Sequence, residues 1–195
     1  MMATRNGITI NKILLAATEI VDKNGVEELT LASLAQKLEI RSPSLYNHFD
    51  GLHGLRRLLS IYGLEQLLST LMRAAIGRSG DEAIREMAAA YIGFVRMHPG
   101  LYEVTLMSPA DLDVELQKVS QEIVDLVTRV LGAYQLDNAD SIHAARSLRS
   151  MLHGFASLEQ KGGFGLPIDL DESLMHMIDT FLAGLHIRYP QERTQ

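Results

Sequence analysis

Four neighbouring side chains carry the most distinctive chemistry of this chain. Ser44, Tyr46, Asn47 and His48 supply hydroxyl, amide and imidazole groups within one short segment. When a helix presents such groups outward, they can hydrogen-bond to base edges or phosphates of a nucleic acid. On an ordinary helical hairpin the same groups would only face water, so the elements that position them decide between the two interpretations.

The sequence predicts a short helix from Pro43 to Phe49 beneath these groups. Ser42 is a favoured N-cap residue, and Pro43 suits the first helical position because it lacks only an amide that would be unpaired there. Leu45, Phe49 and Leu52 follow at i, i+4 and i+7, which places them on one face. That face would pack inward and leave the polar groups outward.

Two further helices are expected before this segment. The first begins at Thr9 as N-cap and ends at Gly25. The second begins at Thr30, whose hydroxyl and neighbouring amides can contact a phosphate. The apolar stripe of this second helix consists of Leu31, Leu34, Ala35 and Leu38.

The rest of the chain also predicts helices, and no segment shows the alternation of a strand with hairpin turns. We therefore expect an all-α protein, with a three-helix helix-turn-helix domain over residues 1–51 and a helical effector-binding and dimerisation bundle over residues 52–195. Within the bundle the expected helices cover residues 52–78, 81–98, 101–107, 110–134, 138–160 and 171–189.

Composition and charge limit the classes of protein. The chain is 47% hydrophobic and 22% charged, and it contains no cysteine, which excludes disulfides and thiolate metal sites. No apolar run is long enough to cross a membrane and no signal peptide is recognisable, so we expect a cytoplasmic protein without a membrane partner. The net charge of −6 disfavours nucleic acid, but residues 1–60 hold seven basic and six acidic residues, so the acidity lies elsewhere.

Over about residues 9–58 the chain resembles the N-terminal domain of TetR-family transcriptional repressors. The resemblance rests on the pattern Leu29-Thr30-Leu31, Leu34-Ala35, Ile40, Leu45-Tyr46-Asn47-His48-Phe49 and Leu55. It implies a homodimer that binds palindromic double-stranded operator DNA and is released by a small-molecule effector. The residues expected at the DNA are Thr30, Arg41, Ser42, Pro43, Ser44, Tyr46, Asn47 and His48.

Three positions depart from the family pattern. Glu39 stands where the turn usually has glycine, and a non-glycine residue at positive φ costs roughly 1 kcal/mol, so a different turn geometry is one expectation. Arg41 replaces a serine and can add a phosphate contact. Leu52 replaces a lysine that would contact a phosphate, and Arg56 and Arg57 are the nearest basic residues.

Residues 152–167 look like the TetR subgroup with a Trp-His-Gly motif, although Leu152 stands at the tryptophan position. The resemblance implies that the helical domain encloses a small-molecule pocket. Few charges fall on the inner helix faces, so we expect an apolar or weakly polar effector. The candidate lining residues are Tyr62, Tyr91, Phe94, Met97, His98, Tyr102, Met107, His143, Met151 and Phe155. Individually, each is better explained by core packing than by ligand contact.

The last two expected helices carry more apolar residues than one bundle face requires. Two copies would then form a four-helix interface with two-fold symmetry, unless both faces belong to the core of one chain. The candidate dimer residues are Leu148, Met151, Phe155, Leu174, Ile178, Phe181, Leu182 and Leu185.

Other functions have weaker support. An enzyme is not expected, because the available pairs Ser108/Asp111 and Asp169/Asp171 are of a kind that loops commonly contain. No cofactor site is expected, and the glycine-rich segment at 162–165 lacks the strand and the lysine of a phosphate-binding loop. No metal site is expected. The two histidines of each pair, His143/His153 and His176/His186, would lie about 15 Å apart along a helix, which is too far for one metal ion. The main alternative is a helical interaction or sensor protein that retains the fold without specific DNA binding.

Overall fold

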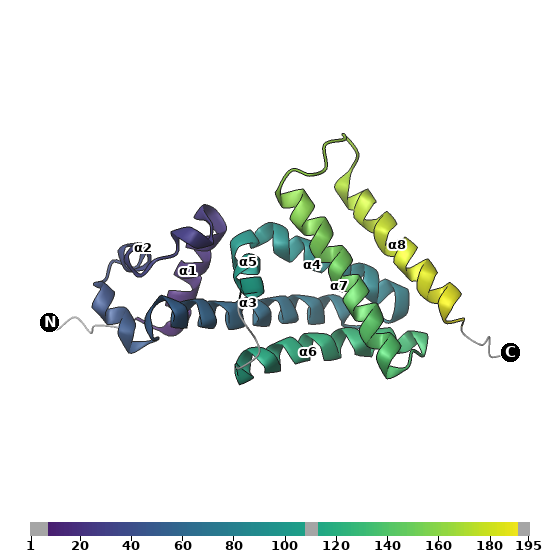
Figure 1. Cartoon of the computed structure of the whole chain (residues 1–195), viewed down its shortest axis with the longest axis horizontal. Helices are drawn as coiled ribbons and strands as arrows, with labels where there is room; N and C mark the ends of the chain where they lie inside the picture. Colours follow the sequence, from purple (N-terminus) through teal and green to yellow (C-terminus); the bar gives the residue numbers. More distant parts are fainter. Residues whose placement is uncertain (1–7, 108–112, 191–195) are drawn as a thin grey trace. The chain divides into compact units, whose positions relative to one another are not determined.

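The computed structural model describes residues 8–107 and 113–190, apart from the side chain of Met107. The described ranges contain helices and no strand, which confirms the all-α class (Figure 1). In chain order the elements are α1 (Ile10–Asn24), η1 (Val26–Glu28), α2 (Leu31–Lys37), η2 (Ser42–Asn47), α3 (Gly51–Ala75), α4 (Gly80–Met97), α5 (Pro99–Met107), α6 (Val114–Leu131), η4 (Gly132–Tyr134), α7 (Asn138–Gln160) and α8 (Leu170–Arg188).

The chain folds into two compact units that do not follow the order of the sequence. Unit 1 comprises Met1–Glu65 and Met97–Leu116, and unit 2 comprises Gln66–Arg96 and Gln117–Gln195. The long helix α3 therefore contributes its first part to unit 1 and its second part to unit 2. The domain boundary expected after residue 51 stays a prediction. Unit 1 extends beyond this boundary, since it also contains α5, which packs on α1.

The ends of α1 are formed as the sequence predicts. Thr9 is the N-cap, and its side-chain oxygen accepts a hydrogen bond from the backbone N–H of Lys12. At the other end Gly25 has φ 92°, and its N–H donates to the Val21 carbonyl. Glycine suits this position because it lacks the Cβ that makes positive φ costly.

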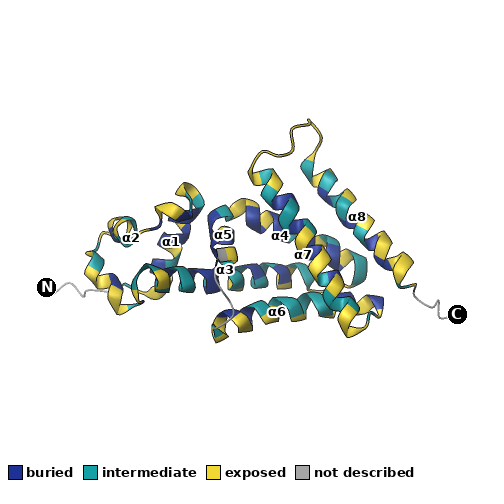
Figure 2. Cartoon of the chain, in the orientation of Figure 1, coloured by how far each residue is buried: buried dark blue, intermediate teal, exposed yellow. Residues whose placement is uncertain are grey.

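Unit 1 has a core to which each of its N-terminal helices contributes one face. Figure 2 shows the buried positions of α1 alternating with exposed ones along the helix. Full burial of a large aliphatic side chain contributes about 1.5–3 kcal/mol relative to exposure. Fully buried members of this core are Ile13, Ala17, Leu29, Leu34, Leu45, Leu55 and Leu59.

Two of the expected helices in the remainder end three residues early, whereas the bounds of the other expected helices agree with the structure to within two residues. The helix expected over residues 52–78 ends at Ala75, and the chain reaches positive φ at Gly77 and Gly80 before α4 continues. For the helix expected over residues 110–134, residues 110–112 lie outside the described part, and the α-helix ends at Leu131. The tighter turn η4 follows it.

Unit 2 contains α7 and α8 as a contacting pair, joined by a loop over residues 161–169 that is exposed throughout. Each helix begins at an aspartate N-cap, Asp137 for α7 and Asp169 for α8, whose carboxylate accepts backbone N–H bonds. The largest fully buried aliphatic side chains of the unit are Ile84, Ile92, Leu131, Ile178 and Leu182.

Candidate nucleic-acid interface

The short helix predicted from Pro43 to Phe49, which carries the candidate DNA contacts, is present as the 3-10 helix η2. Arg41 is its N-cap and makes no side-chain cap hydrogen bond, so the expectation that Ser42 caps the helix is wrong. Instead the turn closes by i→i+3 bonds, with Ser44 N–H donating to the Arg41 carbonyl at 2.9 Å and His48 N–H donating to the Leu45 carbonyl at 2.9 Å. Such bonds suit a short segment and wind more tightly than an α-helix.

The buried and exposed side chains in and after η2 are those that the apolar pattern predicts, although the helix expected to reach Phe49 ends at Asn47. Leu45 is 0% exposed and Phe49 is 8% exposed, whereas Tyr46 is 58% exposed. The predicted DNA contacts divide accordingly: Thr30, Arg41, Pro43, Ser44, Tyr46 and Asn47 are exposed, and Ser42 and His48 are half-buried. Their contacts with DNA stay predictions, but the side chains are available at the surface of unit 1.

Thr30 fixes the start of α2 through a reciprocal capping box. Its side-chain oxygen accepts from the backbone N–H of Ser33 at 3.0 Å, and its own N–H donates to Ser33 Oγ at 3.0 Å. Ser33 Oγ also donates to the Glu28 carbonyl at 2.8 Å. Sequence reasoning missed Ser33, because the usual signal is Glu or Gln three residues after the cap. With the Thr30 hydroxyl and amide both engaged, a phosphate at this helix end would meet the remaining first-turn amides.

The turn between α2 and η2 keeps a left-handed residue despite the missing glycine. Glu39 has φ 54°, its N–H donates to the Gln36 carbonyl at 3.1 Å, and Ile40 N–H donates to the Ala35 carbonyl at 3.0 Å. These two bonds form the helix ending that usually contains glycine. The alternative expectation of a different turn geometry is therefore wrong, and the backbone strain of roughly 1 kcal/mol is retained.

Two of the basic residues near the interface are engaged in ion pairs. Lys37 Nζ lies 2.6 Å from Glu19 Oε2. Arg57 donates to Asp113 through Nε and Nη2 and to Glu115 at 3.0 Å, and the Asp113 hydrogen bond is the main cause that raises the pKa of Arg57. Arg57 therefore does not substitute for the phosphate-binding lysine that the family pattern has at the position of Leu52. Within the described ranges Arg41 makes no ion pair and is the exposed cation beside η2.

Within unit 1 the carboxylate of Asp22 links α1 to α5. Asp22 Oδ2 lies 2.8 Å from His98 Nδ1, and Asp22 Oδ1 accepts from the Leu101 backbone N–H at 2.8 Å. At Gly100 the backbones are so close that a Cβ would lie 2.1 Å from the Val21 carbonyl oxygen. The helix-turn-helix elements and α5 are thereby held together.

The candidate effector residues lie in both units. Tyr62, Met97, His98 and Tyr102 belong to unit 1, whereas Tyr91, Phe94, His143, Met151 and Phe155 belong to unit 2. Tyr91, Phe94, Tyr102 and Phe155 are buried, Met97 is 72% exposed and His143 is exposed. The Met107 side chain lies outside the described residues. Their role as a lining stays a prediction.

Most of the candidate dimer residues are already buried within one chain. Only Met151 and Phe181 of the set are half-exposed, and the buried members are Leu148, Phe155, Leu174, Ile178, Leu182 and Leu185. Burial against their own chain leaves those six little surface for a partner. Nearby apolar side chains that are exposed are Leu158, Phe164, Leu166, Ile168 and Ile187.

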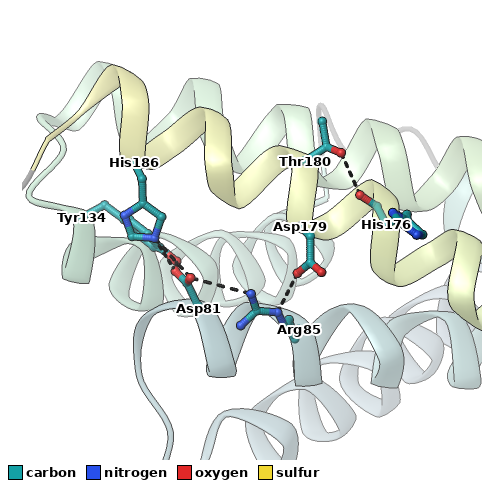
Figure 3. Close-up of polar contacts among 7 residues, drawn as sticks. All are labelled: Asp81, Arg85, Tyr134, His176, Asp179, Thr180 and His186. Atoms are coloured by element: carbon teal, nitrogen blue, oxygen red, sulfur yellow. Dashed lines mark hydrogen bonds and ion pairs between the residues drawn. The ribbon is translucent and has the colours of Figure 1, made fainter.

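A polar network in unit 2 joins α8 to the start of α4 (Figure 3). Asp81 Oδ1 accepts from the Tyr134 hydroxyl at 2.6 Å and lies 2.9 Å from His186 Nε2. Arg85 Nε donates to Asp179 at 2.8 Å. Burial raises the pKa of the Asp81 carboxyl, but the hydrogen bonds from Tyr134 and His186 outweigh burial and leave that pKa below its ordinary value.

Metal and membrane sites are not found within the described residues. No three or more histidine, aspartate and glutamate side chains are grouped there so that they could hold a metal ion. In the same part of the chain, none of the helices has the length and hydropathy required to span a bilayer.

Comparison with known proteins assigns this architecture to a family. Residues 84–181 match the family model described as the tetracyclin repressor-like C-terminal domain. The chain belongs to the TetR family of transcriptional regulators. The predicted family is thereby confirmed, although this match lies outside residues 9–58. The helix-turn-helix class is confirmed by the names of two curated relatives. The match does not distinguish the Trp-His-Gly subgroup, which stays a prediction.

Two curated relatives extend the similarity over nearly the whole TetR-family chain. The uncharacterized HTH-type transcriptional regulator YobS of Bacillus subtilis is 42% identical over 188 residues, covering 95% of this chain and 97% of the relative. The uncharacterized HTH-type transcriptional regulator Rv0681 of Mycobacterium tuberculosis is 35% identical over 177 residues, covering 90% of this chain and 81% of the relative.

Solved structures share the fold at lower identity. A protein of unknown function from Rhodococcus sp. RHA1 superposes with a TM-score of 0.80 at 23% identity, covering 94% of this chain and 98% of that one. A single-residue variant of TetR from Acinetobacter baumannii AYE, in complex with minocycline, has a TM-score of 0.70 at 18% identity. The match covers 94% of this chain and 99% of that one. Both establish the fold of this TetR-family member.

Proposed function

We propose that the protein is a ligand-responsive transcriptional repressor that binds palindromic operator DNA as a dimer. The observation that carries the proposal is the polar outer face of η2, which is held in place by buried Leu45 and Phe49. A short helix fixed from behind can enter the major groove. Two copies related by a two-fold axis would read half-sites about 34–36 Å apart, or a multiple of that spacing.

Release by a small apolar or weakly polar molecule completes the proposed function. The related A. baumannii protein was solved with minocycline, which supports a ligand-binding role for the helical domain of this chain. The helix α3 spans both units, so a change in unit 2 can act on unit 1 through it. A free-energy difference of a few kcal/mol between two conformers suffices for such a shift.

Retardation of promoter DNA tests the proposal. The wild-type protein should bind its own promoter at low salt, and the double variant Tyr46→Ala/Asn47→Ala should lose this binding while its helicity and dimer mass are unchanged. Gln160→Ala, an exposed change in unit 2, serves as the control. Intact binding by the double variant would show that η2 does not read the DNA.

A helical interaction or sensor module without specific DNA binding is the second candidate. The engagement of Arg57 by Asp113 and Glu115 favours it, because one potential phosphate contact is removed. The leucine at position 52 removes another. A protein of this kind would bind promoter DNA no better than unrelated DNA of the same length, at any salt concentration.

A further inference from the structure

Two buried polar atoms on α3 have no hydrogen-bond partner. They are Arg56 Nε and Ser60 Oγ, and they are the two such side-chain atoms within the part of the chain that the structure describes. Ser60 is 0% exposed, so water at the surface does not satisfy its hydroxyl. A buried unpaired polar group costs about 1–3 kcal/mol, and more when it is charged. Two of them therefore need an explanation.

The two groups are placed to act together. Arg56 and Ser60 are at positions i and i+4, so they lie on the same face of α3, about 6 Å apart along it. Gly63, one further turn along this face, lies against α5, where a Cβ would approach Thr105 Cγ2 to 2.7 Å and Leu101 Cδ1 to 3.2 Å. The polar pair is therefore flanked by an apolar, closely packed contact between α3 and α5.

The chemistry of the pair selects its partner. An arginine guanidinium only donates hydrogen bonds, and a serine hydroxyl can donate one. A shared partner must present an acceptor to the guanidinium, and a second acceptor oxygen on the same group suits the serine hydroxyl. Negative charge is favoured beside a guanidinium. The neighbouring Arg57 already has two carboxylates, Asp113 and Glu115, whereas Arg56 makes no ion pair within the described ranges.

We propose that Arg56 and Ser60 form the recognition point for an acidic effector, a small organic molecule with a carboxylate on an apolar body. This inference rests on the proposed ligand-responsive function and sharpens its effector class. A phosphate of DNA is the competing partner, but a side chain as deeply buried as Ser60 cannot reach a phosphate backbone. This proposal departs from the expectation of an apolar or weakly polar effector, because the molecule keeps an apolar body but carries a charged head group.

Thermal unfolding of the full chain with three matched probes tests the site. Hexanoate, hexan-1-ol and hexylamine share one alkyl chain and differ in the head group. Hexanoate should raise the Tm in a dose-dependent way beyond sodium chloride of equal ionic strength, and the alcohol and the amine should not. Arg56→Gln and Ser60→Ala should each weaken the apparent affinity for hexanoate roughly tenfold or more. Arg57→Gln is the matched control and should keep the hexanoate shift.

The variant Ser60→Ala gives a second, independent readout without any probe. Removing an unpaired buried hydroxyl should raise the Tm of the free protein, whereas removing a hydroxyl with a structural partner would lower it. A lower Tm, or a hexanoate shift that is equal in wild type and both variants, overturns the proposal. The proposal is also overturned if none of the three probes changes the Tm.

Promoter binding, measured separately, distinguishes this inference from the proposed function. If hexanoate binds through Arg56 and Ser60 but the protein never binds its promoter, the acid site stands and the repressor function fails. If the promoter binds and the acid does not, only the acid site fails. Loss of promoter binding in Arg56→Gln with an unchanged hexanoate shift would make Arg56 a phosphate contact and overturn the proposal.

Discussion

The Asp22 carboxylate on α1 lies 2.8 Å from the His98 imidazole, at the junction of α4 and α5. The same carboxylate accepts from the Leu101 N–H, so it occupies the amino-terminal end of α5. Unit 1 resumes at Met97 after the chain leaves unit 2, which places this contact at the first residues of the returning segment. One acidic side chain thus ties the last turn of α1 to α5.

Loss of the Asp22 carboxylate should destabilise unit 1. Asp22→Ala removes the acceptor of two hydrogen bonds, and we expect a decrease of about 1–3 kcal/mol in the free energy of unfolding by urea. Asp22→Asn keeps one acceptor and should fall between Asp22→Ala and wild type. Glu103→Ala, an exposed acid on α5, is the control. Equal stability of Asp22→Ala and this control would mean that the link contributes nothing.

Gly100 should not tolerate a side chain. In Gly100→Ala the Cβ would lie 2.1 Å from the Val21 carbonyl oxygen, so α1 and α5 must separate. We expect a loss of about 1–3 kcal/mol or more in urea unfolding. Gly93→Ala on α4 has no heavy atom within 4 Å of the new Cβ. It should be neutral or stabilising by up to about 1 kcal/mol. Similar stabilities for the two variants would rule out a close approach of the backbones at Gly100.

Glu39→Gly should stabilise the helix-turn-helix. Glycine adopts φ 54° without the steric cost that Glu39 carries. The gain should be at most about 1 kcal/mol, seen as a higher Tm, because the freedom of glycine in the unfolded chain offsets part of it. Gln135→Gly, at φ 55° in unit 2, should show a gain of the same sign. A lower Tm for both variants would contradict the interpretation of strain.

The Asp81 network should make stability depend on pH on the acid side. Because the folded-state pKa of Asp81 is lowered, its contribution is complete above the ordinary value of 3.8 and is lost as the pH falls through the lower folded-state pKa. Tyr134→Phe removes one hydrogen bond to the carboxylate and should reduce the loss of stability between about pH 5 and pH 2. Tyr46→Phe, in unit 1, should leave the profile unchanged. Identical profiles for all three proteins would exclude this role of Asp81.

The fold could be predicted because its signals are local. Thr9 and Gly25 mark the ends of α1 by capping chemistry that depends on a few neighbouring residues. The apolar pattern identifies Leu45 in η2 and Phe49 just after it as buried for the same reason. Ser42 is wrongly predicted as a cap because Pro43 fits the first turn of an α-helix and of a 3-10 helix equally well.

The contacts that hold the candidate site together could not be predicted. Asp22 and His98 are far apart in the sequence, and no pattern pairs them. Arg57 is a plausible phosphate contact in the sequence because its partner Asp113 meets it only in the folded chain. The apolar residues of α7 and α8 illustrate a similar limit, since periodicity marks Leu148 and Ile178 as buried without saying whether against their own chain or a second copy.

Selection of genomic DNA fragments by the purified full chain tests the central claim most directly. Fragments bound at low salt would be sequenced for wild type and for Tyr46→Ala/Asn47→Ala, and the selection repeated with candidate effectors. We predict an enriched inverted repeat with half-sites about one helical turn apart or a multiple of that, lost in the double variant. Fragments without a common sequence, or the same enrichment by the double variant, would contradict DNA reading by η2.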